Sequence, residues 1–124
     1  MEGRMIRDFR ELIVWQKSHQ LFLDIMRDIE GFPKTQATKI VIDQLLRSCG
    51  SISANIAEGF GRKKGKEYVH YLIIARGSTT ETLNWLLKCV DANWFDKETF
   101  HHREKTIEEV LKMLNRMIGQ KITS

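Results

Sequence analysis

Hydrophobic residues recur every three or four positions along most of the chain, which is the spacing of one face of an α-helix. Four such stretches predict helices over residues 12–30, 36–60, 66–93 and 97–118. Gly31-Phe32-Pro33 follows the first stretch, Gly59 and Gly61 close the second, and Gly119 follows the fourth. We expect the helices to end at these glycines, because glycine is the poorest helix former after proline.

The links between the four stretches are short, roughly three to seven residues, and short links favour antiparallel neighbours. Thr35 and Asp96 precede the second and fourth stretches and are suitable N-caps. No alternating pattern indicates a strand. We therefore expect a single all-α domain over residues 1–124, an antiparallel up-down-up-down four-helix bundle.

The third stretch is apolar on more than one side. One stripe contains Tyr68, Leu72, Ala75, Thr79, Leu83, Leu86 and Val90, and a second set contains Val69, Ile73, Ile74, Trp85 and Leu87. With Trp85 and Ile74 exposed, a monomer would present an unusually large apolar patch. We therefore expect the protein to associate with itself.

Polar residues run along one face of the second predicted helix: Gln44, Arg47, Ser51, Asn55, Glu58 and Arg62. Two interpretations stay open. The face is either solvated, with an ion pair at its end, or part of a polar network between helices or subunits, in which Asn55 and Glu58 hold the helix in place. In the third helix, Gly77 costs about 1 kcal/mol relative to alanine. We expect it to allow a close approach to Gly50 or Ala54 of the second helix.

Charge adds a candidate binding surface to this picture. The net charge is +4 and the pI is near 9.2, a mild excess that permits an anionic partner. Basic residues cluster between the second and third helices and near the N-terminus. The candidates for contacts with nucleic acid are Arg62, Lys63, Lys64, Lys66, Arg4, Arg7 and Arg10.

The sequence contains no recognisable catalytic or metal-binding motif. His19, His70, His101 and His102 form no His-x-x-x-His pair, and there is no Gly-x-Ser-x-Gly or phosphate-binding loop. Cys49 and Cys89 lie in apolar-periodic helices, so we expect buried, reduced thiols. No apolar run reaches the roughly 18 to 20 residues of a membrane span, and the start does not resemble a signal peptide. We expect a cytoplasmic protein without membrane contact, cofactor, metal or catalytic residues.

Several motifs together resemble a known family. They include Asp8-Phe9-Arg10-Glu11-Leu12, Val14-Trp15-Gln16-Lys17, Phe32-Pro33, Asn55-Ile56-Ala57-Glu58-Gly59, Gly61-Arg62, Glu67-Tyr68 and Ala75-Arg76-Gly77-Ser78. Over about residues 8 to 118 the chain resembles the four helix bundle protein family, also called the ribosomal RNA intervening-sequence protein family. Leu46 departs from the pattern where members usually have an arginine, and so does Lys39-Ile40-Val41, which replaces an aromatic-Gly-Leu stretch.

The resemblance implies a homopentamer with a central channel. It also implies kinship in fold with accessory proteins of diversity-generating retroelements, which partner a reverse transcriptase and nucleic acid. No catalytic residue is implied. The motif positions implied to be structural are Gln44, Arg47, Ser51, Asn55, Glu58, Gly59, Arg76, Gly77, Ser78 and Glu81.

Two functional hypotheses follow. The first is a non-enzymatic, homo-oligomeric bundle that binds RNA or another nucleic acid electrostatically, as an accessory factor. The second is a protein-binding oligomeric scaffold with no nucleic-acid role, in which the basic residues serve solubility.

Overall fold

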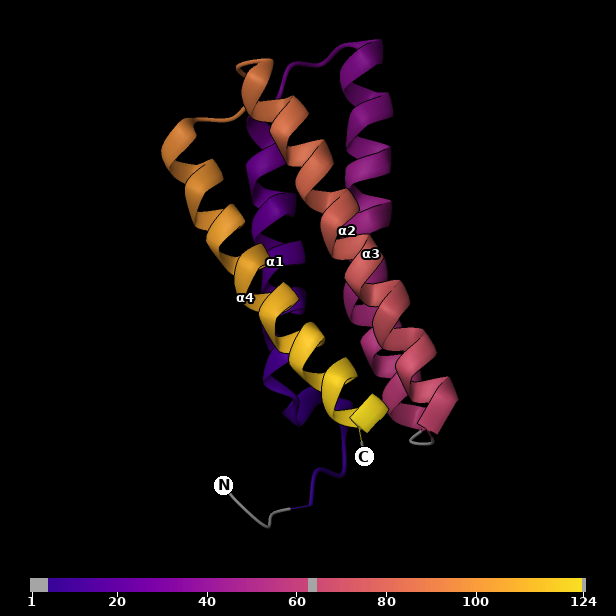
Figure 1. The fold of residues 1–124 in the computed structure, drawn as a ribbon. Coiled ribbons are helices and arrows are strands. Elements are labelled where there is room, and N and C mark those ends of the chain that lie inside the picture. The colour runs from indigo at the N-terminus through magenta and orange to yellow at the C-terminus, as the bar shows by residue number, and fades with distance from the viewer. Residues whose placement is uncertain (1–4, 63–64, 124) are drawn as a thin grey trace.

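The computed structural model describes residues 5–62 and 65–123, with side chains up to residue 120. It has four long helices, α1 (Ile13–Asp28), α2 (Gln36–Arg62), α3 (Gly65–Asp91) and α4 (Lys97–Thr123), and two single-turn 3-10 helices, η1 (Phe9–Glu11) and η2 (Ile29–Gly31). The described residues contain no strand, so the protein is all-α. None of their helices is long and apolar enough to cross a membrane. The long helices run alternately up and down in Figure 1, so α1 begins and α4 ends at the lower end.

The predicted caps begin two of the helices. The backbone N–H of Thr38 donates to Thr35 Oγ1 at 3.1 Å at the start of α2. At the start of α4, the N–H of Thr99 donates to Asp96 Oδ1 at 2.8 Å. These side chains satisfy N–H groups that have no partner within the helix.

The predicted helix ends at Gly59, Gly61 and Gly119 are wrong. Helix α2 continues through both glycines to Arg62, and α4 passes Gly119 and ends at Thr123. A helical glycine costs only about 1 kcal/mol, which packing can offset. A Cβ built at Gly59 would lie 2.9 Å from the Cβ of Tyr71. The glycine therefore lets α3 approach α2 closely, and the helix continues.

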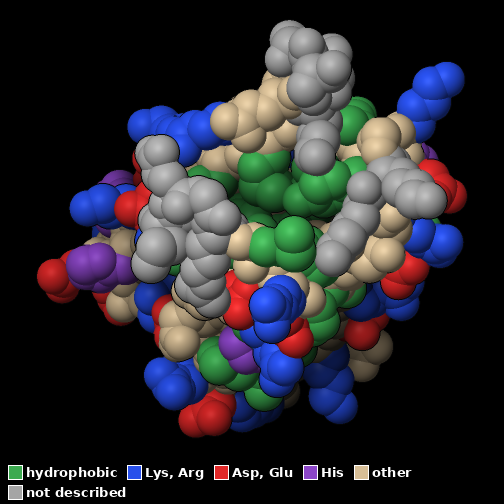
Figure 2. Space-filling model, turned by 90° about the horizontal axis from the view of Figure 1, so that it is seen from below, with side chains coloured by type: hydrophobic (Ala, Val, Ile, Leu, Met, Phe, Trp, Pro, Cys, Tyr) green, Lys and Arg blue, Asp and Glu red, His purple; other side chains and the backbone are tan. Residues whose placement is uncertain are grey.

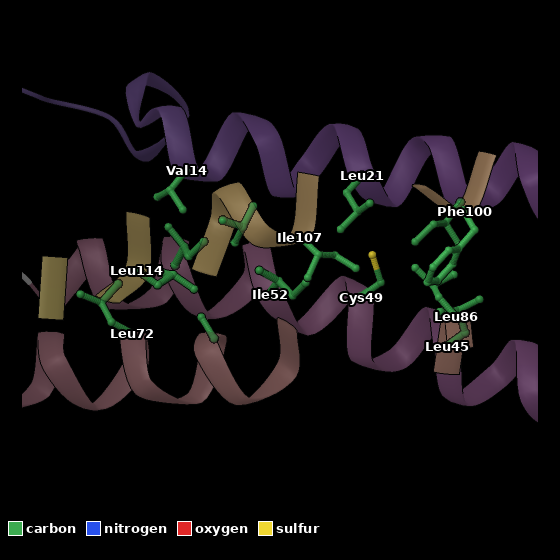
Figure 3. Close-up of a cluster of buried hydrophobic side chains, with 14 of the residues drawn as sticks. Val14, Leu21, Leu45, Cys49, Ile52, Leu72, Leu86, Phe100, Ile107 and Leu114 are labelled. Carbon is green, nitrogen blue, oxygen red and sulfur yellow. The ribbon is translucent and has the colours of Figure 1, made fainter. Parts of the chain in front are cut away.

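One hydrophobic core lies between the four helices. Its completely buried members include Leu21, Ile25, Leu45, Ile52, Leu72, Leu86, Ile107 and Leu114. All but Ile25 are labelled in Figure 3, which shows them pointing from all four helices into the space between the helices. Burial of each such side chain contributes roughly 1.5 to 3 kcal/mol. Helix α1 packs on α2 and α4, and α3 packs on the same two helices, so α1 and α3 lie diagonally across the bundle.

The second apolar set of α3 is only partly exposed. Ile73, Ile74 and Leu87 are 42%, 37% and 41% exposed. Trp85 is half-buried against the core, and its Nε1–H donates to Glu81 Oε2 at 3.4 Å. The expectation that Trp85 is exposed is therefore wrong, whereas that for Ile74 is right.

Candidate nucleic-acid interface

Three separate parts of the chain lie at the lower end of the bundle: the described residues before α1, the end of α2 with the start of α3, and the end of α4 (Figure 1). The chain has 20 basic and 16 acidic residues, of which nine basic and five acidic fall in residues 1–11, 58–67 and 116–124. This leaves eleven of each sign for the rest of the chain. The whole net charge of +4 therefore belongs to these three segments of the sequence, although their described side chains are five basic and four acidic. We call the end of the bundle where the described parts of the segments lie the basic end.

The N-terminal arginines differ in how strongly they are held. The Arg10 guanidinium donates to both carboxylate oxygens of Asp8, at 2.9 and 2.8 Å. These hydrogen bonds, with one from the Arg10 backbone, lower the pKa of Asp8 to about 2. The Asp8 carboxylate is therefore ionised at neutral pH and balances the positive charge of Arg10. The Arg7 side chain is exposed, and its backbone N–H donates to Glu11 Oε1 at 2.9 Å.

Arg62, at the end of α2, interacts with side chains of both α2 and α3. Its guanidinium lies 3.1 Å from Glu58 Oε2 and 3.5 Å from the Tyr71 hydroxyl, and its Cζ lies 5.6 Å from the centre of the Tyr71 ring. The Tyr71 hydrogen bond and the nearby Glu58 raise the pKa of Arg62. Lys66 is exposed. The remaining candidates, Lys63, Lys64 and Arg4, lie outside the described residues.

An apolar surface lies at the centre of the basic end. Figure 2, which looks at this end from below, shows hydrophobic side chains gathered in the middle with Lys and Arg side chains around them. A groove of about 380 Å³ runs between the start of α1 and the end of α4, with Arg116 and Gln120 among its lining residues. Its apolar lining is Leu12, Ile13, Val14, Met113 and Met117. The basic end therefore offers both positive charge and an apolar recess.

Part of the polar face of α2 forms a seam with α3. Asn55 Nδ2 donates to the backbone oxygen and the hydroxyl of Ser51, both at 2.8 Å. The Ser78 hydroxyl of α3 donates to Ser51 Oγ at 2.9 Å. Deeper in the seam, the Thr82 hydroxyl donates to Ser48 Oγ at 3.1 Å. The structure thus brings Ser51, Asn55 and Ser78 together as an interhelix network, with Ser51 as its link between helices.

Other motif residues lie apart from this seam. Glu58 is exposed and pairs with Arg62 of its own helix, so it does not hold α2 against a neighbour as expected. Arg47 is exposed and Gln44 is half-buried. On α3, Arg76 Nη1 donates to Asn115 Oδ1 of α4 at 3.0 Å.

The expected close approach of Gly77 to α2 is wrong. A Cβ built at Gly77 would have no atom within 4 Å, whereas one at Gly50 would lie 3.3 Å from the Phe22 ring of α1. Gly77 lies on the exposed side of α3, and Gly50 on the side of α2 that faces α1. The two glycines therefore belong to different surfaces.

Sequence reasoning missed an ion-pair cluster between α1 and α4. Arg103 donates to both carboxylate oxygens of Asp28, at 2.7 and 3.0 Å, and lies 3.6 Å from Asp24. The spacing of Asp24 and Asp28, four residues apart on one helix face, is a signal for a shared partner. Nothing local to α1 identifies that partner as Arg103.

Candidate metal ligands do not cluster within the described residues, and both cysteines are buried. The described residues contain no group of three or more His, Cys, Asp or Glu that could hold a metal ion. Cys49 and Cys89 are buried and unbonded, as predicted. Burial raises the pKa of Cys49 to about 12 and that of Cys89 to about 11. Both thiols are therefore protonated at neutral pH, and the thiolate is the reactive form.

Comparison with known proteins places the chain in a family. The model of the 23S rRNA-intervening sequence protein family matches residues 10–116. The chain belongs to this family. The resemblance seen in the sequence is thereby confirmed, and the matched range runs from η1 into α4.

A solved structure extends the comparison to the fold. It is a protein of unknown function from the S23 ribosomal protein family of Bacteroides thetaiotaomicron. It shares 25% sequence identity, covers 86% of this chain and 98% of its own, and has a TM-score of 0.78. No curated protein matches the chain.

Proposed function

We propose that this protein is a non-enzymatic, homo-oligomeric helical bundle that binds RNA or another nucleic acid at its basic end. The observation that carries the proposal is the distribution of charge, because the whole net +4 belongs to the segments that meet there. Contacts of Lys and Arg with phosphates supply affinity without reading sequence. We therefore expect little preference for the sequence of the nucleic acid. We also propose that the protein acts in the cytoplasm.

One protomer alone would bind weakly. Asp8 and Glu58 already compensate Arg10 and Arg62 at the basic end. If several copies pointed their basic ends the same way, many modest phosphate contacts would act together. We therefore propose antiparallel up-down-up-down protomers in a closed ring, with five copies favoured by the family resemblance.

Exposed apolar side chains support self-association. Within the described residues, the large hydrophobic side chains that are exposed are Met5, Ile13, Met26, Ile40, Ile73, Ile74 and Leu87. Single exposed apolar residues are ordinary, but Ile73 and Ile74 are adjacent on one helix. Contact between copies would remove them from water.

Reversing charge at two places on the bundle tests the proposal. In Lys63→Glu with Lys64→Glu, binding to RNA in a gel-shift assay should fall on the order of tenfold or more, because phosphate contacts become repulsions. Lys34→Glu with Lys39→Glu makes the same change in net charge near the opposite end and is the matched control. It should bind nearly as the wild type does. Equal losses in both variants would overturn the assignment to the basic end.

The apolar groove favours a second candidate function, in which the protein is a scaffold that binds another protein. Met113 and Met117 give the groove an adaptable lining that suits the side chains of a partner protein. A reverse transcriptase is the kind of partner that the family resemblance suggests. If the wild type retains no RNA or DNA, and Met117→Asp abolishes capture of a partner protein, the scaffold replaces the nucleic-acid function.

A further inference from the structure

Two stacked aromatic rings lie on the surface of α1. The rings of Trp15 and His19 are nearly parallel, with centroids 4.6 Å apart and an angle of 11° between their planes. The two residues are four positions apart, the spacing at which side chains of one helix meet. Phe9 of η1 adds a third ring, which meets Trp15 in a T-shaped contact with centroids 5.1 Å apart. Two elements of the fold thus build one aromatic cluster.

The two stacked rings differ in their exposure. Trp15 is half-buried and packs against the hydrophobic core, whereas His19 is exposed. The core therefore holds Trp15, and Trp15 in turn fixes the plane of the His19 ring. A ring that is already held in place loses little conformational freedom when a ligand stacks on it. The pair therefore presents a preorganised aromatic surface to solvent.

A second exposed histidine provides a contrast at the opposite end of the bundle. The side chain of His101 is 71% exposed, and it neighbours the buried ring of Phe100. The two ring planes are tilted by 59°, with centroids 5.7 Å apart, so these rings do not stack. Exposure alone therefore does not produce the parallel arrangement that His19 and Trp15 adopt.

The stack lies close to the arginines of the basic end. Helix α1 begins at this end (Figure 1), and His19 follows Ile13 by six positions, which is about 9 Å along the helix axis. Gln16 Nε2 donates to the backbone oxygen of Arg10 at 2.8 Å and so holds η1 against the start of α1. The side chains of Arg7 and Arg10 are exposed. A strand whose phosphates contact the basic end can therefore reach the stack with a nearby base.

An exposed aromatic ring beside basic residues suits a single-stranded nucleic acid. Every base has a flat π surface that can stack on an aromatic side chain, so such a contact keeps sequence preference low. In a duplex the bases stack on one another, and a protein reaches mainly their edges, the sugars and the phosphates. Phosphate contacts alone do not favour the single strand, because a duplex has the higher charge density. The preference between the two forms therefore separates stacking from charge.

We propose that His19, held by Trp15, stacks on an unpaired base of a single-stranded nucleic acid whose phosphates contact the basic end. This inference rests on the proposed function and adds the form of nucleic acid that the protein binds. It assigns His19 the role of a flat ring, so another aromatic residue can replace it. Trp15 is the residue that positions this ring.

Substitutions at the two exposed histidines test the stack. Gel-shift titrations at one salt concentration compare a single-stranded RNA that lacks self-complementary stretches with a duplex RNA of equal length. The wild type should bind the single strand more tightly. His19→Ala should weaken single-strand binding on the order of tenfold and leave duplex binding nearly unchanged, because it removes one base stack. Its fold should persist, because position 19 is exposed and alanine is the best helix former.

Two further variants complete the test. His19→Tyr keeps a flat ring and should bind the single strand nearly as the wild type does. His101→Ala makes the same change as His19→Ala at the opposite end of the bundle, and it should also leave binding unchanged. The dependence of affinity on salt should be the same in His19→Ala as in the wild type, because the stack contacts a base and not a phosphate.

The possible failures separate the stack from the basic end. A wild type that binds neither RNA would overturn the proposed function and this inference together. If the wild type binds RNA, equal losses of single strand and duplex in His19→Ala, with a weaker salt dependence, would make His19 a phosphate contact and overturn only the stack. Unchanged single-strand binding in His19→Ala, a wild type that prefers the duplex, or a His19→Tyr variant as weak as His19→Ala would also overturn it.

Discussion

The two ends of the bundle are built in opposite ways. At the end away from the basic end, Phe32, Phe95 and Phe100 are only 3%, 7% and 5% exposed. The Phe32 ring lies 5.8 Å from the rings of both Trp94 and Phe95, measured between centroids. At the basic end, Ile13 is 55% exposed beside an apolar groove. Aromatic packing closes one end, whereas the other leaves apolar surface and charge accessible.

The ion pairs at the two ends differ in the same way. Arg103 and Asp28, toward the closed end, have side chains that are 20% and 12% exposed, and their two parallel hydrogen bonds join α4 to α1. Asp8 and Arg10, at the basic end, lie two residues apart in one exposed turn. A pair between helices stabilises the fold, whereas a local exposed pair adjusts surface charge. The comparison indicates that one end contributes stability, while the other leaves charged side chains exposed to solvent.

Truncating one apolar side chain at each end gives the largest expected difference. Phe32→Ala should lower the free energy of unfolding by about 3 kcal/mol or more, because loss of the buried ring leaves a cavity beside Trp94 and Phe95. Ile13→Ala should lower it by less than about 1 kcal/mol, because its side chain is already largely in water. Urea unfolding measures both, at one protein concentration because association affects stability. Similar losses would contradict the difference between the ends.

Removing one arginine at each end gives a smaller difference. Arg103→Ala leaves Asp28 without its partner and should cost about 1 to 3 kcal/mol. Arg10→Ala should leave the thermal midpoint unchanged, because Asp8 and Arg10 lie only two residues apart and their side chains are 38% and 71% exposed. Calorimetry on the two variants measures the shift in thermal midpoint that each substitution causes. A larger shift for Arg10→Ala would reverse the assigned roles.

Local signals in the sequence explain what could be predicted. The apolar stripes located the four helices, and Thr35 and Asp96 marked two helix starts, because both signals depend on residues within one turn. The predicted helix end at Gly59 is wrong because the low helix propensity of glycine is a local property. The contact with Tyr71 that compensates for it comes from another helix. The sequence does not show which residue of α3 faces which residue of α2. The predicted approach of Gly77 to α2 is therefore wrong.

The candidate site was predictable in composition but not in assembly. The seven basic residues were visible as two clusters in the sequence. The pairs Asp8–Arg10 and Glu58–Arg62 are local in sequence, whereas the place of the end of α4 at the same end of the bundle depends on how the helices are arranged. The interhelix bond from Ser78 to Ser51 likewise required the register of α3 along α2.

The salt dependence of RNA binding tests the central claim most directly. If a ring of basic ends contacts roughly six to ten phosphates, the affinity of the wild type should fall by about a thousandfold or more between 50 and 200 mM salt. RNAs of equal length and unrelated sequence should behave alike, because phosphate contacts do not read bases. Filter-binding titrations at several salt concentrations measure how steeply the logarithm of the affinity falls with the logarithm of the salt concentration. Absence of binding at 50 mM salt, or an affinity that does not change with salt, would contradict binding at the basic end.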